Sequence, residues 1–159
     1  MEIWELVDSD GNLSGVLYER GSKKPIPEGL YFRVVEVWTK IGDKLLITQR
    51  HPSKWMGLKW EVSGGGVVFG EEIRDAAVRE LFEETGLTAQ LDSTKRAVIE
   101  YPIGKKGHKQ VVFFPGKVSG TPRVRQGEIE RYKWVSAGEL ERYLFPDTVE
   151  ACRSLIESL

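Results

Sequence analysis

The chain has 159 residues, of which 40% are hydrophobic and 30% are charged, and its 23 basic and 24 acidic side chains almost cancel. This length and composition predict one globular domain, residues 1–159, that buries about two thirds of the surface of the unfolded chain. The near-zero net charge argues against duplex nucleic acid as a partner. A membrane span is excluded because no apolar run approaches the roughly 18 residues that it needs.

Four segments rich in β-branched and aromatic residues predict two antiparallel hairpins in the first third of the chain. These segments are residues 3–7, 16–18, 31–39 and 44–48. The turn signal Asp8-Ser9-Asp10-Gly11-Asn12 separates the first pair. Further on, the short predicted strand Trp60-Glu61-Val62 runs into Gly64-Gly65-Gly66, where missing side chains permit a tight turn or the close approach of a ligand.

A helix is predicted from about Glu71 to Thr85, because Glu71 and Glu72 suit its first turn and Gly86 suits a left-handed C-terminal cap. At 100° per residue, four apolar side chains share the face that should pack on the sheet, and three acidic ones point away from it. The apolar set is Ala77, Val78, Leu81 and Phe82, and the acidic set is Glu80, Glu83 and Glu84.

The rest of the chain predicts three strands and two helices. The strands are residues 96–103, 110–118 and 133–135, and the helices are residues 137–143 and 148–158, broken at Pro146. Cys152 is the only cysteine, which excludes an intramolecular disulfide and a cysteine zinc site. The N-terminal residues lack the basic and apolar segments of a signal peptide, so we expect a cytoplasmic protein. The oligomeric state is open, and a homodimer is one alternative.

Glu80, Glu83 and Glu84 are the strongest chemical signal. Carboxylates three and four positions apart on a helix are neighbours, so their oxygens can converge on one or two hard divalent cations. Without a cation, each like-charged pair costs about 0.2–0.5 kcal/mol. Magnesium keeps several waters and leaves room for phosphate oxygens, which favours metal-assisted displacement at phosphorus. Helix periodicity alone does not distinguish this site from a solvated acidic face.

The spacing around these glutamates resembles the signature of the Nudix hydrolases. Nine defining positions are filled in this chain: Gly65, Glu71, Arg79, Glu80, Leu81, Glu83, Glu84, Gly86 and Leu87. The resemblance implies an α+β fold, an α/β/α sandwich with a mixed sheet between helices and an N-terminal hairpin. It also implies a bound Mg²⁺ or Mn²⁺ and cleavage of a diphosphate linkage, in a nucleoside diphosphate derivative or related metabolite, by metal-activated water.

The same resemblance assigns roles to individual residues. Glu80 and Glu84 are expected to be the main metal ligands, with Glu83 as a further ligand or the base and the Gly65 carbonyl as a backbone ligand. Arg79 and Glu71 are expected to orient the ligand side chains.

Other expected site residues lie outside this stretch. In the family, a distal acidic ligand from the loop before a late tryptophan strand often completes the site. The candidate for this ligand or base is Glu128, before Trp134, and Glu130 is the alternative. The substrate candidates, on segments that border the pocket in the family, are Arg50, Trp55, Phe32 and Arg33.

Two alternative functions remain. The N-terminal layout, including Trp4-Glu5-Leu6-Val7-Asp8, is similar to that of isopentenyl diphosphate isomerases. Those enzymes use a cysteine shortly after the position of Arg50 and a histidine-rich metal site, whereas residues 50–55 hold no cysteine and Phe32-Arg33 replace an expected histidine. A non-catalytic nucleotide-binding Nudix module is the second alternative, although such modules usually lose the glutamates that this chain retains.

Overall fold

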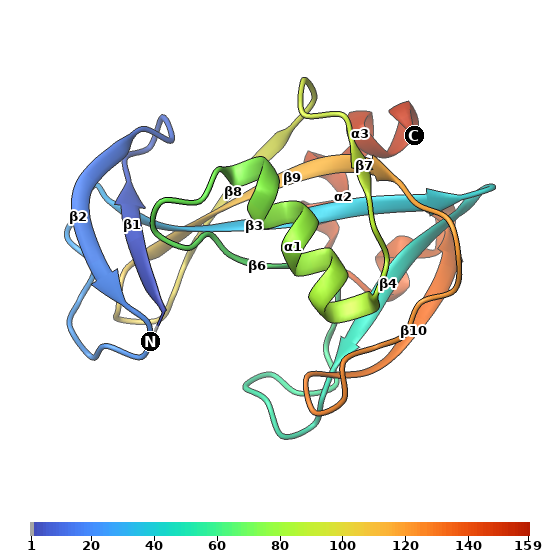
Figure 1. The fold of residues 1–159 in the computed structure, drawn as a ribbon, viewed down its shortest axis with the longest axis horizontal. Coiled ribbons are helices and arrows are strands. Elements are labelled where there is room, and N and C mark those ends of the chain that lie inside the picture. The colour runs from blue at the N-terminus through green and yellow to red at the C-terminus, as the bar shows by residue number, and fades with distance from the viewer. Residues whose placement is uncertain (1) are drawn as a thin grey trace.

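A mixed β-sheet forms the centre of the computed structural model, which describes residues 2–159, and helices cover both of its faces (Figure 1). The strands are β1 (Ile3–Val7), β2 (Leu13–Glu19), β3 (Tyr31–Ile41), β4 (Lys44–Arg50), β5 (Trp60–Glu61), β6 (Ser63–Gly66), β7 (Gln90–Leu91), β8 (Ala97–Pro102), β9 (His108–Lys117) and β10 (Ile129–Ser136). The helices are α1 (Ile73–Thr85), the short 3-10 helix η1 (Ala137–Arg142), α2 (Pro146–Ala151) and α3 (Arg153–Ser158). The predicted α/β/α sandwich with an N-terminal hairpin is confirmed.

The central strand β3 divides the sheet and creates the space for a site. It pairs in parallel with β9 along its whole length and antiparallel with β6 over residues 34–37. It pairs with β4 only at the hairpin end, through Lys40 with Leu45 and Ile41 with Lys44. The segment β5–β6 fills the gap where β3 and β4 diverge, because β5 pairs with β4 while β6 pairs with β3.

Alternate side chains of β3 supply two separate cores, as period-two alternation requires. Val35 and Val37 pack in the cluster under α1, together with Ala76, Ala77 and Leu81 of that helix. Burial of these helix side chains fixes α1 against the sheet.

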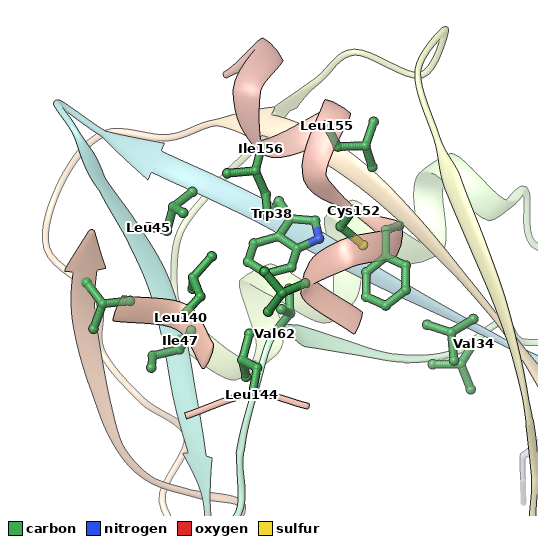
Figure 2. Close-up of a cluster of buried hydrophobic side chains, with 14 residues drawn as sticks. Val34, Trp38, Leu45, Ile47, Val62, Leu140, Leu144, Cys152, Leu155 and Ile156 are labelled. Atoms are coloured by element: carbon green, nitrogen blue, oxygen red, sulfur yellow. The ribbon is translucent and has the colours of Figure 1, made fainter. Parts of the chain in front are cut away.

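The opposite face of β3 belongs to a second core. Val34 and Trp38 pack there, and Figure 2 shows Trp38 beside Cys152, Leu155 and Ile156 of the C-terminal segment. The Trp38 side chain is fully buried, so it serves the packing of this core. No helix within residues 2–159 is long and apolar enough to cross a lipid bilayer.

The hairpin β1–β2 lies at one end of the molecule (Figure 1). It joins the rest of the sheet through Val7, which pairs with Tyr31 of β3. Its aromatic anchor is Trp4, whose ring stacks on Phe32 of β3 at a centroid distance of 3.9 Å. The hairpin is therefore held against β3 close to the start of the central strand.

Four details of the sequence reading were wrong. Gly64–Gly66 form strand β6 rather than a turn, because their backbone pairs with β3. Helix α1 begins at Ile73 rather than Glu71. Phe82 is 57% exposed, since Ala76 takes its expected place in the core. The predicted helix of residues 148–158 begins earlier, at Pro146, because the first helical position needs no amide donor, and it is divided at Cys152 into α2 and α3.

Candidate active site

A polar cleft of about 520 Å³ opens at the divergence of β3 and β4. We call it the carboxylate cleft. Helix α1 supplies Glu80, Glu83 and Glu84 to it, and β6 supplies the backbone of Gly64–Gly66. The three glutamates that the sequence placed on one helix therefore reach one cleft in the structure. Glu84 is only 8% exposed, so it points into the protein rather than away from the sheet as predicted.

Arg79 ties the acidic side chains together. Its Nε and Nη2 donate to the two oxygens of Glu71 at 2.7 and 2.9 Å, and Nη1 donates to Glu80 Oε1 at 2.9 Å and to Glu83 Oε2 at 3.2 Å. Its Nη2 also donates to the Gly66 carbonyl at 3.2 Å. The planar guanidinium of Arg79 therefore donates to three carboxylates and to one carbonyl of β6. A lysine ammonium group could not reproduce this geometry.

The glycines of β6 are required by close contacts. An added Cβ on Gly65 would overlap the carboxyl group of Glu80, so a side chain there would displace that carboxylate. An added Cβ on Gly64 would lie 1.9 Å from the Val35 carbonyl oxygen. The Gly64 amide in turn donates to Glu84 Oε1 at 3.0 Å. Gly64 therefore permits the close approach of β6 to β3, and Gly65 leaves space for the Glu80 carboxylate of α1.

Burial raises the pKa of two carboxyl groups in the cleft. Burial raises the pKa of Glu84 to about 8, and the negative charge of Glu61 adds to the rise. Burial also raises the pKa of Glu80, while the hydrogen bond from Arg79 opposes the rise. Low solvation combined with neighbouring negative charge penalises the ionised form of a carboxyl group. A cation in the cleft would remove that penalty.

The donor set fits a hard divalent cation by its chemistry. Among residues 2–159, no three acidic, histidine or cysteine side chains are already gathered around a single point. However, the enclosed carboxylate of Glu84 accepts a backbone amide and is paired with no cationic side chain within residues 2–159. Oxygen donors of this kind are the ligands that magnesium and manganese prefer. Glu80, Glu83, Glu84 and the Gly65 carbonyl are therefore suited to hold such an ion.

Glu128 faces the same cleft from the loop before β10. That loop is fastened to the end of α1, because the Arg123 amide donates to the Thr85 carbonyl at 2.7 Å and the Arg125 amide donates to the Glu84 carbonyl at 2.9 Å. Lys54 Nζ lies 3.4 Å from Glu128 Oε1. The alternative, Glu130, is outside the cleft lining, so the structure favours Glu128 of the two.

The four predicted substrate residues lie in three different places. Phe32 and Arg50 line the carboxylate cleft, and Arg50 Nη1 lies 3.3 Å from Glu61 Oε1. Trp55 lies beside a neighbouring cavity and is 76% exposed. Arg33 faces away from both, because its position on β3 turns it toward α1, and its guanidinium donates to the Gly11 carbonyl. The substrate assignment of Arg33 is therefore corrected to a contact that fastens the N-terminal hairpin.

A second cavity of about 200 Å³ adjoins the carboxylate cleft. We call it the aromatic pocket, and its main walls are Trp60, Tyr101 and Phe145. Glu36 and Glu61 line both cavities, so the two lie next to each other.

Sequence reasoning missed this pocket because its residues come from distant parts of the chain. One signal was available. Glu36 stands between Val34 and Trp38, where the alternation of β3 requires an apolar side chain.

The N-terminal hairpin also reaches the carboxylate cleft, through Glu2, Trp4 and Arg20. Glu2 links the other two, since Trp4 Nε1 donates to its Oε1 at 2.7 Å and Arg20 Nη1 donates to its Oε2 at 3.0 Å. These residues were not among the predicted site residues. No short-range pattern reveals them, because their approach depends on the docking of β1 against β3.

A family model described as NUDIX domain matches residues 30–157. The chain belongs to the Nudix family. The prediction of family membership is confirmed, and the stretch of Nudix residues from Gly65 to Leu87 coincides with β6 and α1 at the carboxylate cleft.

Two relatives illustrate what the family members do. An RNA pyrophosphohydrolase of Bartonella quintana is 29% identical over 149 residues, which cover 81% of this chain and 82% of the relative. A candidate 8-oxo-dGTP diphosphatase of Bacillus subtilis is 40% identical over 89 residues, which cover 55% of this chain. The chain spans 57% of the length of the Bacillus relative.

A solved structure extends the likeness of the fold to the hairpin. A crystal structure of a Deinococcus radiodurans protein matches with a TM-score of 0.74 and 22% identity, covering 97% of this chain and 99% of that chain. The fold of that protein therefore includes counterparts of most elements described above.

Proposed function

We propose that this Nudix protein hydrolyses the diphosphate linkage of a nucleoside diphosphate derivative or a related metabolite, with Mg²⁺ or Mn²⁺ as the cofactor. The observation that carries the proposal is the enclosed Glu84 carboxylate, which lies beside Glu80 and the glycine strand without a cationic partner among residues 2–159. The names of the two relatives support it, because removal of pyrophosphate from RNA and hydrolysis of a nucleoside triphosphate both break a phosphoric anhydride.

Each residue of the cleft has a place in this reaction. Glu80, Glu83, Glu84 and the Gly65 carbonyl would hold the ion, which neutralises phosphate charge and activates water when bound. Arg79 keeps Glu80 and Glu83 in position through its hydrogen bonds.

Other charged residues of the cleft would act on the substrate and the water. Arg50, Lys54 and Arg125 line the same cleft and would bind phosphate oxygens. Glu128, which faces Lys54, would accept a proton from the attacking water.

The isomerase alternative is less well supported. Its chemistry needs a cysteine near the reacting carbon, and the only cysteine, Cys152, lies in the core beside Trp38. No cysteine lines the part of the cleft formed by residues 2–159. The cleft therefore favours hydrolysis over proton transfer to carbon.

The decisive experiment measures product release from a panel of diphosphate compounds with and without Mg²⁺. The panel contains nucleoside diphosphate derivatives, nucleoside triphosphates, a 5′-triphosphorylated RNA oligonucleotide and isopentenyl diphosphate. We expect metal-dependent hydrolysis of at least one compound, and a loss of about a thousandfold in Glu84→Gln. Glu72→Gln is the matched control, because Glu72 is exposed and lies outside the cleft.

Two results would contradict the proposal. Tight nucleotide binding without turnover of any compound would indicate the non-catalytic module. Conversion of isopentenyl diphosphate to its isomer would indicate the isomerase. Calorimetry with Mg²⁺ and Mn²⁺ in the presence of a non-hydrolysable diphosphate tests metal uptake independently of turnover.

A further inference from the structure

The carboxylate cleft has a different neighbourhood at each end of the acidic stretch of α1. Beside Glu84 lies the loop before β10, because the Arg125 amide donates to the Glu84 carbonyl at 2.9 Å and the Glu128 amide donates to the Arg125 carbonyl at 3.2 Å. One turn earlier on α1, Glu80 lies against Gly65 of β6. A helix rises about 1.5 Å per residue, so these two glutamates are about 6 Å apart along its axis. The two ends of the cleft can therefore contact different parts of one substrate.

The N-terminal hairpin borders the end of the cleft that holds Glu80. An added Cβ on Gly66, the next residue of β6, would lie 3.0 Å from Trp4 Nε1, so the edge of the indole ring lies against this strand. The Trp4 ring is stacked between two others, with centroid distances of 3.9 Å to Phe32 and 6.4 Å to Tyr18. This support fixes the hairpin beside the glycine strand.

Arg20 is the cationic side chain that the hairpin brings to this end of the cleft. Its Nη1 donates to Glu2 Oε2 at 3.0 Å, and its backbone amide donates to the Glu2 carbonyl at 3.0 Å. The other carboxylate oxygen of Glu2 accepts from Trp4 Nε1 at 2.7 Å. Glu2 therefore orients Arg20 through a side chain that is itself anchored to the stacked indole ring.

The Arg20 guanidinium keeps donors for a ligand. Arg79, which lines the same cleft, donates to three carboxylates and to one carbonyl. Arg20 makes one side-chain hydrogen bond within residues 2–159, whereas a guanidinium carries about five N–H donors. Its side chain is 61% exposed and lines the cleft, so a ligand can reach the remaining donors. An ion pair this exposed adds little to the stability of the fold, so the place of Arg20 favours ligand binding over a structural role.

We propose that Arg20 binds a negatively charged group of the substrate at the hairpin end of the cleft, so that this chain selects diphosphate compounds with a further anionic group beyond the scissile linkage. A phosphate or a carboxylate can meet the guanidinium in the same bidentate geometry. Lys54 and Arg125 lie at the opposite end, beside Glu128 and Glu84. A substrate bound by both ends therefore carries negative charge on both sides of the expected metal ligands. This inference rests on the proposed hydrolysis and adds a class of substrate to it.

The test compares the full chain and its variants on two pairs of compounds, each differing in one anionic group. The first pair is a nucleoside diphosphate and the triphosphate of the same base, and the second is UDP-glucose and UDP-glucuronate. Wild type should show a kcat/KM at least about tenfold higher for the more anionic member of at least one pair, the effect of about one hydrogen bond to a charged group. The first pair reports a phosphate and the second a carboxylate.

The variants assign this preference to one side chain. Arg20→Gln should lower the preference about tenfold, mainly through KM, and should leave kcat/KM for the less anionic member within about twofold. Arg20→Lys should retain part of the preference, because it keeps the charge but not the planar fork. Arg74→Gln is the matched control, because Arg74 is an exposed arginine outside the cleft, and it should leave the preference unchanged.

Binding measurements separate this inference from the proposed hydrolysis. Calorimetry in Mg²⁺ with methylene-bridged, non-hydrolysable analogues of both pairs should show tighter binding of the more anionic member, and Arg20→Gln should abolish the difference. Such a difference without turnover of any compound would contradict the hydrolysis and support the role of Arg20.

Two results would overturn the role of Arg20 and leave the hydrolysis standing. The first is turnover with equal or lower kcat/KM for the more anionic member of both pairs. The second is a wild-type preference that persists unchanged in Arg20→Gln. Thermal unfolding of each variant checks that the fold is retained.

Discussion

The carboxylate cleft and the aromatic pocket share Glu36 and Glu61, yet their other residues differ in how far apart they lie in the sequence. The three glutamates proposed to hold the metal ion all come from one helix, α1. The walls of the pocket come from β5, β8 and the segment before α2, which are far apart in the chain. The metal-binding residues proposed for the reaction are therefore encoded locally, whereas the walls of the pocket are brought together only by folding.

The substitution Gly65→Ala should lower the turnover number by altering the carboxylate cleft, and it should leave the aromatic pocket unchanged. The new Cβ would overlap the carboxyl group of Glu80, and a displacement of about 1 Å in a catalytic constellation costs about a hundredfold in rate. The turnover number should fall by about this factor, while nucleoside monophosphate binding stays within about twofold. Gly138→Ala is the control, because an added Cβ there meets open space. A parallel loss of monophosphate binding would show that the two cavities are not separable.

Arg79→Lys should have a smaller effect on the same cleft. A lysine keeps the charge but cannot replace the fork that joins Glu71, Glu80 and Glu83. Loss of a group that orients metal ligands typically lowers metal affinity or activity about 10- to 100-fold, so the Mg²⁺ concentration for half-maximal rate should rise. Arg74→Lys, at an exposed position of the same helix, should leave that concentration unchanged. An unaltered metal requirement in Arg79→Lys would remove Arg79 from the positioning role.

The substitution Glu36→Gln should change how the stability of the folded protein depends on pH. The folded pKa of Glu36 is raised to about 8 from an ordinary value of 4.5, so between these values the unfolded state releases a proton that the folded state keeps. Stability of the wild type therefore falls as pH rises through this window. The variant lacks this contribution, so its melting temperature relative to wild type should increase from pH 5 to pH 8 in metal-free buffer. The scale is about 2–4 °C for each kcal/mol, and a constant difference would contradict the raised pKa.

Trp55→Ala should have the smallest effect on the pocket. The side chain is 76% exposed at the pocket mouth, so its removal should change KM by about twofold and kcat not at all. Trp60→Ala provides the comparison, because Trp60 is partly buried in the wall and should raise KM more strongly. A larger effect at Trp55 would show that the loop after β4 contacts the bound substrate.

The same contrast explains what could be predicted from the sequence. The hairpins, the helix cap at Gly86 and the glutamates of α1 follow from local patterns, and the structure bears out the cap, since the Gly86 amide donates to the Phe82 carbonyl at 2.8 Å. The path of Gly64–Gly66 could not be predicted, because a glycine run becomes a strand only when a partner such as β3 is present. Arg33 was placed at the site because the sequence does not show which face of β3 meets which cavity.

The hairpin β1–β2 has a consequence for how this Nudix chain should be handled and compared with its relatives. Residues 1–29 lie outside the segment that the family model matches, yet Trp4 and Arg20 stand beside the carboxylate cleft and Trp4 covers Phe32. A protein truncated to residues 30–157 would retain every glutamate of α1. It would lose Trp4 and Arg20, which form one wall of the carboxylate cleft. Changes in this hairpin can therefore alter which molecules reach the acidic side chains while α1 stays unchanged.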